Sequence, residues 1–460
     1  MIALKIQFRG KNNKILSLAP TRIIVLSFAA IILIGTLLLS LPAASRNGRS
    51  IGLLNALFTA TSATCVTGLV VVDTYKHWSL LGQIVIMILI QTGGLGIVTL
   101  ASFFSVLLGR KVGLKGMLLA QESLNHFSFE GILNLIKKVV VVAFSLELAG
   151  AILLSVRFVP LLGPKGFYIA AFHSVSAFCN AGFDLMSISG KGEFISFTGF
   201  NNDPLVLYTL AALVVTGGLG FMVWNDLYEW KKNKALLLHT KVVFAMTAFL
   251  ILFGMLFIFA FECDNPETMG NLNLSGKINA SVFHAVVPRT AGFSSLPVSN
   301  MKEISKVATI ILMFIGAAPG STAGGIKVTT FGVILFAIFS IIKGSENTII
   351  FKRRVPGYTV LKALSIAGLA AMWIVTVATI VLAIEGKPFL DVLYEVSSAF
   401  GTVGLTTGIT PSLHSLSKLL IILTMFLGRI GPFTFAIALT LKSGKARQDV
   451  VYPEGKIVVG

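Results

Sequence analysis

The chain has 460 residues, of which 55% are hydrophobic and only 12% are charged, and its formal net charge is +18. The charged share is about half that of a soluble domain, so the composition indicates a polytopic membrane protein and argues against a soluble enzyme. Three cysteines, Cys65, Cys179 and Cys263, are too few and too scattered for a disulfide framework or a zinc site.

Eight apolar runs are long enough to cross a membrane: 22–43, 79–108, 136–159, 204–224, 240–261, 305–341, 358–384 and 415–441. The first run follows a basic start and lacks a prompt cleavage site, so it is predicted to be a retained helix. Between alternate pairs of runs lies an apolar segment of about ten residues, too short to span, followed by a polar stretch that contains glycine. Each such segment is predicted to be a re-entrant half-helix with a returning loop.

The four polar stretches are alike: SATCVTGL (62–69), SAFCNAGF (176–183), VVPRTAGF (286–293) and SAFGTVGL (398–405). Aligned on Gly68, Gly182, Gly292 and Gly404, they recur at intervals of 114, 110 and 112 residues. This period is far longer than the roughly 20–50 residues of solenoid repeats, so it indicates a subdomain repeated four times.

The basic residues predict the orientation. Of the 37 Lys and Arg residues, 23 fall in the segments on the side opposite the glycine stretches. The positive-inside rule therefore predicts a plasma membrane protein with both termini in the cytoplasm and four loops that enter from outside. The net positive charge is then explained by the membrane topology, and the cytoplasmic basic residues could also bind anionic lipid or a soluble partner. No binding of nucleic acid is expected.

Non-helical backbone at membrane depth must be buried in protein or line a wet cavity. Four glycine loops converging on one axis can present a ring of carbonyl oxygens that replaces the hydration shell of an alkali cation. Glycine permits the backbone angles that such carbonyls need, and the hydroxyls of Thr67, Thr290 and Thr402 can add oxygens. The short helices would direct their negative C-terminal ends at the cation.

Thr402-Val403-Gly404 resembles the core of the potassium-channel filter sequence TVGYG. Over nearly its full length the chain resembles the Trk/Ktr/HKT superfamily of potassium transporters, and is closest to the Ktr-type membrane subunit because one span precedes the first loop. The resemblance implies an all-α integral membrane fold, with eight transmembrane helices and four re-entrant pore helices around one pore. Since all four filter positions are glycine, it also implies potassium selectivity.

The filter residues expected around K⁺ come from all four stretches. They are Thr64, Cys65, Val66, Thr67 and Gly68; Cys179, Asn180, Ala181 and Gly182; Arg289, Thr290, Ala291 and Gly292; and Gly401, Thr402, Val403 and Gly404. The two cysteines are expected to be packing residues. Arg289 is expected to form an ion pair behind the filter, the alternative being an electropositive element beside it. Pro288 marks a departure in the third repeat.

Two acids follow the filter glycines. Asp184 lies two residues after its glycine and is expected to concentrate cations at the outer mouth. Asp73 lies five residues after Gly68, and for it a solvated loop acid is an equal alternative.

The run 305–341 is too long for one crossing and is broken by GAAPGSTAGGIK, residues 316–327. From the residues alone, the break is either a packing kink or a mobile loop below the filter. The resemblance implies the second, an intramembrane gate. The expected gate residues are Gly316, Pro319, Gly320, Ser321, Thr322, Gly324, Gly325, Lys327 and Arg429.

Arg429 lies inside the last span, where a buried arginine is costly and indicates function. It could reach the carbonyls and hydroxyls of the gate loop or form a positive barrier. The alternative is a structural partner, either Glu147 or a helix C-terminus. The resemblance supports contact with the gate loop.

The predicted organisation is a cytoplasmic segment (1–20), repeat 1 (21–110), repeat 2 (111–230), repeat 3 (231–345), repeat 4 (346–445) and a C-terminal tail (446–460). The resemblance implies a homodimer to which the tail contributes, and a cytoplasmic ring of RCK-type nucleotide-binding subunits (KtrA-like). Membrane lipids are further partners. Na⁺ is a candidate activator, and no cofactor bound by this chain is evident.

Three other functions are alternatives to potassium uptake. One is a less selective Na⁺/K⁺ transporter. Another is the translocating subunit of a potassium-pumping ATPase, which normally has additional spans. An intramembrane enzyme is disfavoured because the spans offer Glu147 and few other acids.

Overall fold

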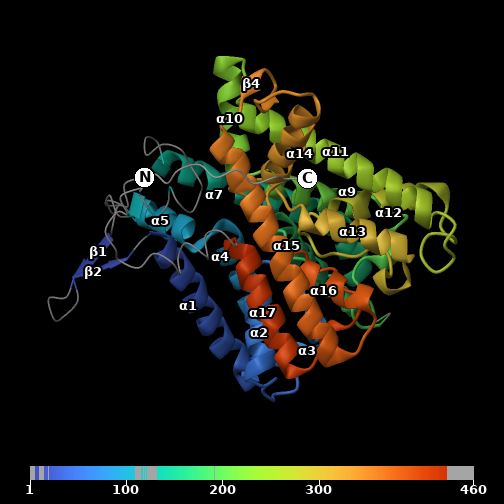
Figure 1. Cartoon of the computed structure of the whole chain (residues 1–460). Coiled ribbons are helices and arrows are strands. Elements are labelled where there is room, and N and C mark those ends of the chain that lie inside the picture. The colour runs from blue at the N-terminus through green and yellow to red at the C-terminus, as the bar shows by residue number, and fades with distance from the viewer. Residues whose placement is uncertain are drawn as a thin grey trace.

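The computed structural model describes residues 6–9, 15–18, 20–108, 116–117, 119, 121, 132–190 and 192–431. Within these residues the chain is mostly helical, with long helices packed side by side around shorter ones (Figure 1). The tail 446–460, the end of the last apolar run from residue 432, and most of the N-terminal segment lie outside the described residues.

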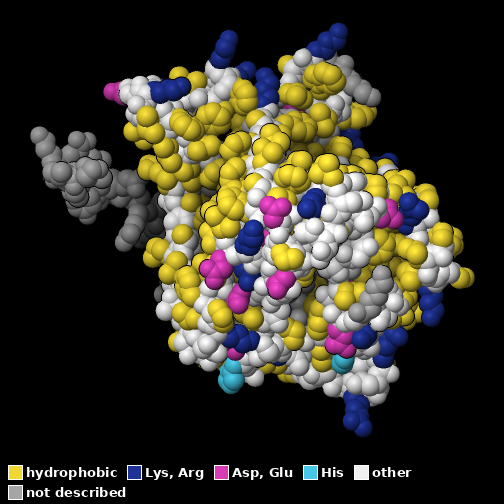
Figure 2. Space-filling view, turned by 90° about the vertical axis from the view of Figure 1, so that its right-hand side faces the viewer, with side chains coloured by type: hydrophobic (Ala, Val, Ile, Leu, Met, Phe, Trp, Pro, Cys, Tyr) yellow, Lys and Arg dark blue, Asp and Glu magenta, His cyan; other side chains and the backbone are white. Residues whose placement is uncertain are grey.

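Four long helices each begin one structural unit: α1 (Pro20–Ser40), α7 (Ile132–Leu162), α11 (Leu238–Glu262) and α15 (Gly357–Glu385). Among the described residues, these four are single helices long and apolar enough to cross a membrane. Large hydrophobic side chains such as Leu33, Leu148 and Phe253 are exposed on them, as expected for helices that face lipid. Figure 2 shows hydrophobic side chains over much of one face, with Lys and Arg at its upper end, where α10 and β4 lie in Figure 1, and also across its lower half.

A short helix follows each long one and packs against it: α2 (Leu53–Thr64), α8 (Lys165–Phe178), α12 (Leu274–Val286) and α16 (Phe389–Gly401). Each ends at one of the predicted glycine stretches. The predicted re-entrant half-helices are therefore present as four short helices with non-helical backbone after them.

The closing segment of each unit is α4 (Leu80–Leu95) with α5 (Ile97–Leu107), α9 (Pro204–Gly218) with α10 (Phe221–Asn233), α13 (Glu303–Phe314) with α14 (Val328–Ile342), and α17 (Ser415–Ile430). Each of the runs 79–108 and 204–224, predicted to be of spanning length, consists of two helices and not one. The two helix pairs are bent by 85° and 90° at the sequence GGLG. The bend requires a positive φ, which Gly96 and Gly220 supply at +81° and +90°.

Short elements complete the described chain. The hairpins are β1 (Ile6–Arg9) with β2 (Ile15–Leu18), and β3 (Ile349–Ile350) with β4 (Arg353–Arg354), both antiparallel. A short helix, α3 (Thr74–His77), and the 3₁₀ turns η1 (Pro42–Ala44), η2 (Met186–Ser189), η3 (Thr198–Phe200), η4 (Val298–Asn300) and η5 (Thr410–Ser412) lie in the connecting loops.

Candidate ion filter and intramembrane loop

The four aligned glycines form a closed ring. A Cβ added to Gly68 would lie 2.5 Å from the carbonyl oxygen of Ala181, and one added to Gly182 would lie 2.6 Å from the Cα of Gly292. A Cβ on Gly292 would approach the Cα of Gly404 at 3.3 Å, and one on Gly404 would approach the Cα of Gly68 at 2.9 Å. Positions more than one hundred residues apart are thus neighbours in cyclic order, with no room for a side chain between them.

The backbone of the four loops repeats the same unusual conformation. The glycines have φ of +90°, +70°, +72° and +92° in chain order. Two residues before them, Val66, Asn180, Thr290 and Thr402 have φ of +51°, +59°, +74° and +50°. Positive φ is rare outside glycine and is an outlier for β-branched residues such as valine and threonine. Its recurrence in every loop indicates a shared, over-determined geometry.

The Ser-Ala pair shared by three stretches fixes this geometry from behind. The amides of Thr67, Ala181 and Val403 donate to the carbonyls of the serines at 62, 176 and 398 over 2.7–2.8 Å. The hydroxyls of two of these serines also accept from the filter glycine amides, Gly68 at 3.1 Å and Gly404 at 3.0 Å. Because these N–H groups bond backwards into the short helices, the loop carbonyls stay available for another ligand.

The third loop differs, as Pro288 predicted. Its short helix ends at Val286, which occupies the place of the serine and offers no hydroxyl. The amide of Ala291 bonds instead to the carbonyl of Val287 at 2.9 Å. The ring therefore contains three similar quarters and one that is braced differently.

Several hydroxyls in the glycine stretches have no hydrogen-bond partner among the described residues. Thr64, Thr67 and Thr402 are fully buried, and no described residue satisfies their Oγ1 atoms. Thr290 differs, since its hydroxyl lies 3.3 Å from the amide of Asn180. Buried hydroxyls normally have a partner, so these free oxygens suit water or a cation.

Arg289 forms no ion pair among the described residues, so the prediction of a salt bridge behind the filter was wrong. Its side chain is only 5% exposed, and its Nη2 donates to the hydroxyl of Thr247 at 3.2 Å. The third loop is thus linked to α11 through a neutral partner. Cys65 and Cys179 are fully buried free thiols, and the described residues contain no His/Cys/Asp/Glu cluster suited to a metal.

The two acids outside the ring have different surroundings. Asp73 is 8% exposed and accepts from the amides of Lys76 at 2.9 Å and Phe194 at 3.0 Å, so it holds the loop that contains Phe194 in the second unit. It is therefore not a solvated loop acid. Asp184 is half-buried, and its carboxylate accepts from the amide of Met186 at 3.1 Å.

The interruption at 316–327 is a non-helical loop that contacts the other units directly. Ala318 donates to the carbonyl of Gly218 at 3.0 Å, and Phe221 donates to that of Gly320 at 2.8 Å. Gly325 donates to the carbonyl of Gly428 at 3.2 Å. The loop is therefore held by the breaks of the second and fourth units.

The same loop touches the filter from one side. Thr322 is fully buried, and its hydroxyl hydrogen-bonds with the side chain of Asn180 at 3.1 Å. A Cβ on Gly324 would lie 2.8 Å from Cγ2 of Thr402. Filter and loop are thus in direct contact in two of the four units.

The remaining predicted gate residues shape the loop itself. Gly316 donates to the carbonyl of Ile326 at 2.8 Å, and Ser321 donates to that of Ala318 at 2.7 Å. Lys327 Nζ donates to the carbonyl of Ala323 at 2.8 Å. The Pro319 carbonyl lies 2.6 Å from where a Cβ on Gly220 would stand, which ties the loop to the second break.

Arg429 joins the loop to the first unit. One guanidinium nitrogen donates to the carbonyl of Thr322, and the other donates to those of Gly93 at 2.5 Å and Gly94 at 3.2 Å. Arg429 therefore binds the loop and the C-terminal end of α4, and it does not bind Glu147. The loop is therefore fastened to all the other units.

Three glycines at the helix breaks were missed from the sequence. A Cβ on Gly93, Gly217 or Gly428 would collide with the carbonyl oxygen at the end of a short helix, namely that of Thr64, Phe178 or Phe400. The signal was present, because GGLG at 93–96 and 217–220 and GRIG at 428–431 recur in three units.

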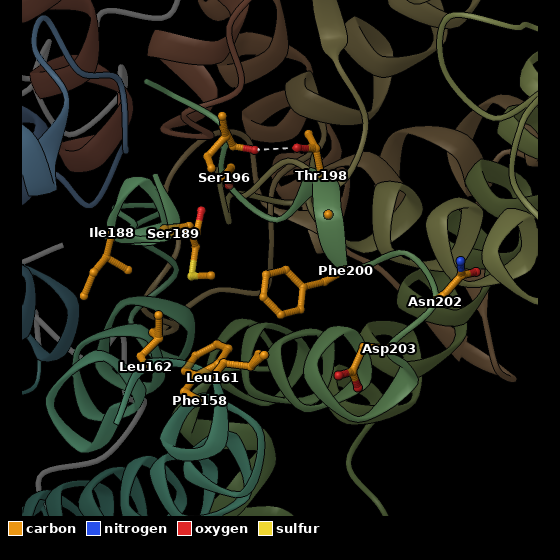
Figure 3. A pocket seen from close by; sticks show the side chains of 13 residues that line it. Phe158, Leu161, Leu162, Ile188, Ser189, Ser196, Thr198, Phe200, Asn202 and Asp203 are labelled. Carbon is orange, nitrogen blue, oxygen red and sulfur yellow. Dashed lines mark hydrogen bonds between the residues drawn. The ribbon is translucent and has the colours of Figure 1, made fainter. Parts of the chain in front are cut away.

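A cavity of about 740 Å³ lies elsewhere, at the end of α7 (Figure 3). Phe158, Leu161 and Phe200 line it, and Asp203 at its edge pairs with Arg157 at 3.2 Å. None of its lining residues belongs to the four glycine stretches or to the loop, so it is separate from the ring.

Comparison with known proteins identifies relatives of nearly the same length. A family model described as "TrkH: Cation transport protein" matches residues 3–448. "Ktr system potassium uptake protein B" of Bacillus subtilis is 41% identical over 98% of this chain and 99% of its own length. "Potassium/sodium uptake protein NtpJ" of Enterococcus hirae is 37% identical over 96% and 98%. The crystal structure of the potassium transporter TrkH from Vibrio parahaemolyticus matches with a TM-score of 0.70 at 19% identity, covering 92% of this chain and 84% of that one.

Proposed function

The chain belongs to the TrkH family of cation transport proteins, and from that premise we propose that the glycine ring is a filter through which it takes up potassium ions. It is a multi-pass membrane transporter of the Ktr/Trk kind and not an enzyme. The observation that carries the proposal is the closed ring of Gly68, Gly182, Gly292 and Gly404.

The chemistry of the ring suits a dehydrated alkali cation. A Cβ on each ring glycine would meet the carbonyl oxygen of the residue that precedes the neighbouring ring glycine. These oxygens therefore line the ring, and they belong to Thr67, Ala181, Ala291 and Val403. The loop amides bond away from the ring, and four helix C-termini bring partial negative charge to it. Carbonyl oxygens in this arrangement replace the water that a K⁺ ion gives up.

The loop 316–327 is proposed to be the gate below this filter. It is irregular backbone at the level of the helix breaks, and its hydrogen bonds reach the second and fourth units and, through Arg429, the first. Because the loop is irregular and many of its contacts with the other units are hydrogen bonds to carbonyls, it can exchange these bonds, closing the conduit in one position and opening it in another.

Regulation and assembly are also proposed. The names of the Bacillus subtilis and Vibrio alginolyticus relatives refer to a Ktr system, which supports a separate cytoplasmic subunit, a KtrA-like nucleotide-binding ring. A homodimer in the plasma membrane, with both termini in the cytoplasm, is the arrangement expected from the sequence. The proposed partner is tested by copurifying this chain with such a ring in the presence and absence of nucleotide, which should change the amount of ring that is recovered.

A second candidate function is transport of both Na⁺ and K⁺, or K⁺ transport activated by Na⁺. The name of the Enterococcus hirae relative supports it, and so does the third loop, which lacks the serine brace of the others. Unequal quarters hold a cation less symmetrically, which weakens discrimination by size.

The test is ⁸⁶Rb⁺ flux into proteoliposomes of the purified protein, with K⁺ or Na⁺ as competitor. We expect K⁺ to compete strongly and Na⁺ weakly. Gly182→Ser and Gly404→Ser should reduce uptake and relax the preference, since any Cβ there meets a neighbouring loop. Two folded variants with unchanged transport would refute the filter, and equal competition by Na⁺ would favour the second candidate.

A further inference from the structure

Glu147 is a buried acid that the proposed filter and gate do not yet use. It lies at the middle of the membrane-spanning helix α7 and is only 4% exposed. None of the ion pairs among the described residues includes it. A carboxyl group at such depth is costly, and its partners indicate what it does.

The partners of Glu147 are neutral and come from two other helices. The amide of Gln91, in α4, donates to both carboxyl oxygens, at 3.0 and 3.2 Å. The thiol of Cys179 lies 3.5 Å from the Gln91 oxygen and 3.9 Å from a Glu147 oxygen. The backbone of Glu147 takes part as well, since its carbonyl accepts from the hydroxyl of Ser174 at 2.5 Å.

Both partners lead directly to the transport machinery. Cys179 caps α8 and is the first residue of the second filter loop. Gln91 lies two residues before Gly93, whose carbonyl binds Arg429 and so connects to the gate loop. The thiol of Cys179 also lies 2.7 Å from where a Cβ on Gly94 would stand, so the filter loop and the helix break are in contact.

We propose that Glu147 is a positioning residue, which acts through Gln91 and Cys179 to hold the second filter loop against the break of α4. The inference rests on the proposed filter function. It assigns to the acid a role in ion discrimination beyond its contribution to stability, because the loop it holds contributes one quarter of the ring.

The physical chemistry separates these two roles. Removing one partner of a buried hydrogen bond leaves the other unsatisfied and destabilises the fold, whereas replacing both by apolar groups is nearly neutral. Gln91→Leu and Glu147→Leu alone should therefore each lower the melting temperature in detergent. The double variant should recover it. Discrimination should not recover, because Cys179 has lost both of its acceptors.

The experiment measures melting temperature and the K⁺/Na⁺ competition ratio for ⁸⁶Rb⁺ uptake in proteoliposomes. We expect the ratio to fall about fivefold or more in Glu147→Leu and in the double variant, and about twofold in Glu147→Gln, which retains one acceptor oxygen. Glu262→Leu is the matched control. Glu262 is a fully buried acid at the end of α11 whose partners, such as Asn265 and Thr268, lie outside the filter. That variant should lose stability and keep the ratio.

Recovery of the ratio together with stability in the double variant would overturn the proposal, because the role would then be structural only. If the double variant cannot be purified, Glu147→Gln decides, and an unchanged ratio overturns it. A wild-type protein without potassium preference would overturn the filter itself. A selective wild type with equally selective Glu147 variants overturns this inference alone.

Discussion

Replacing Arg429 tests whether the intramembrane loop is a gate held by hydrogen bonds. Of its three bonds to carbonyls, one fastens the loop at Thr322 and two fasten the guanidinium to Gly93 and Gly94. A hydrogen bond from a charged donor contributes about 1.5–3 kcal/mol. Arg429→Ala removes the bond to Thr322, so the closed position should lose that amount relative to the open one.

Since about 1.4 kcal/mol corresponds to a factor of ten, the open population should rise roughly 10- to 150-fold. The assay is ⁸⁶Rb⁺ flux into proteoliposomes that contain the purified chain without a cytoplasmic partner. Lys418→Ala is the matched control, because Lys418 lies in the same helix and donates instead to Asn55 at 3.3 Å. It should leave the basal flux unchanged.

Arg429→Lys distinguishes an anchor from a positive barrier. Lysine keeps the charge but lacks the planar fork that reaches two units at once. If the bonds hold the loop, its basal flux should lie close to that of Arg429→Ala. A basal flux as low as that of the wild type would refute the anchor and leave the charge as the barrier. No increase in a folded Arg429→Ala variant would refute both.

Three further predictions follow from other parts of the structure. Deleting residues 317–325 should raise basal flux without a partner, and a folded deletion variant with ordinary flux would contradict the gate. Ser398→Ala removes the acceptor of the Gly404 amide and should lower the K⁺/Na⁺ competition ratio about threefold, with Ser412→Ala in the exposed outer loop as a control that keeps it. Burial raises the pKa of Asp184 to about 6, so its charge is present at pH 7.5 and lost as the pH falls through 6. Uptake at low K⁺ should therefore fall about twofold or more by pH 5, and Asp184→Asn should remove that step; an equal step in the variant would assign it to another group.

Local sequence patterns were sufficient for much of the fold. Apolar runs of spanning length predicted α1, α7, α11 and α15, and short apolar segments followed by glycine stretches predicted the short helices and the loops after them. These features depend on hydrophobicity and on backbone freedom, which each segment carries in its own residues.

Such local patterns could not predict the contacts between segments that are distant in the sequence. Gly93 and Gly217, which precede the 85° and 90° bends, pack against carbonyls of the short helices, a contact that their own run of residues does not encode. The partner of Arg289 was mistaken for the same reason, since Thr247 lies 42 residues away in α11. A buried arginine suggested a carboxylate partner, but the fold places the hydroxyl of Thr247 beside it.

The ring of glycines has a practical consequence because one chain supplies all four members. In a channel built from four identical subunits, any substitution appears four times, so the filter is either intact or altered everywhere. Here each quarter has its own codon, and the number of changed glycines can be set at one, two, three or four. Selectivity can thus be measured as a function of the number of altered glycines, and every protein molecule in the sample carries the same substitutions.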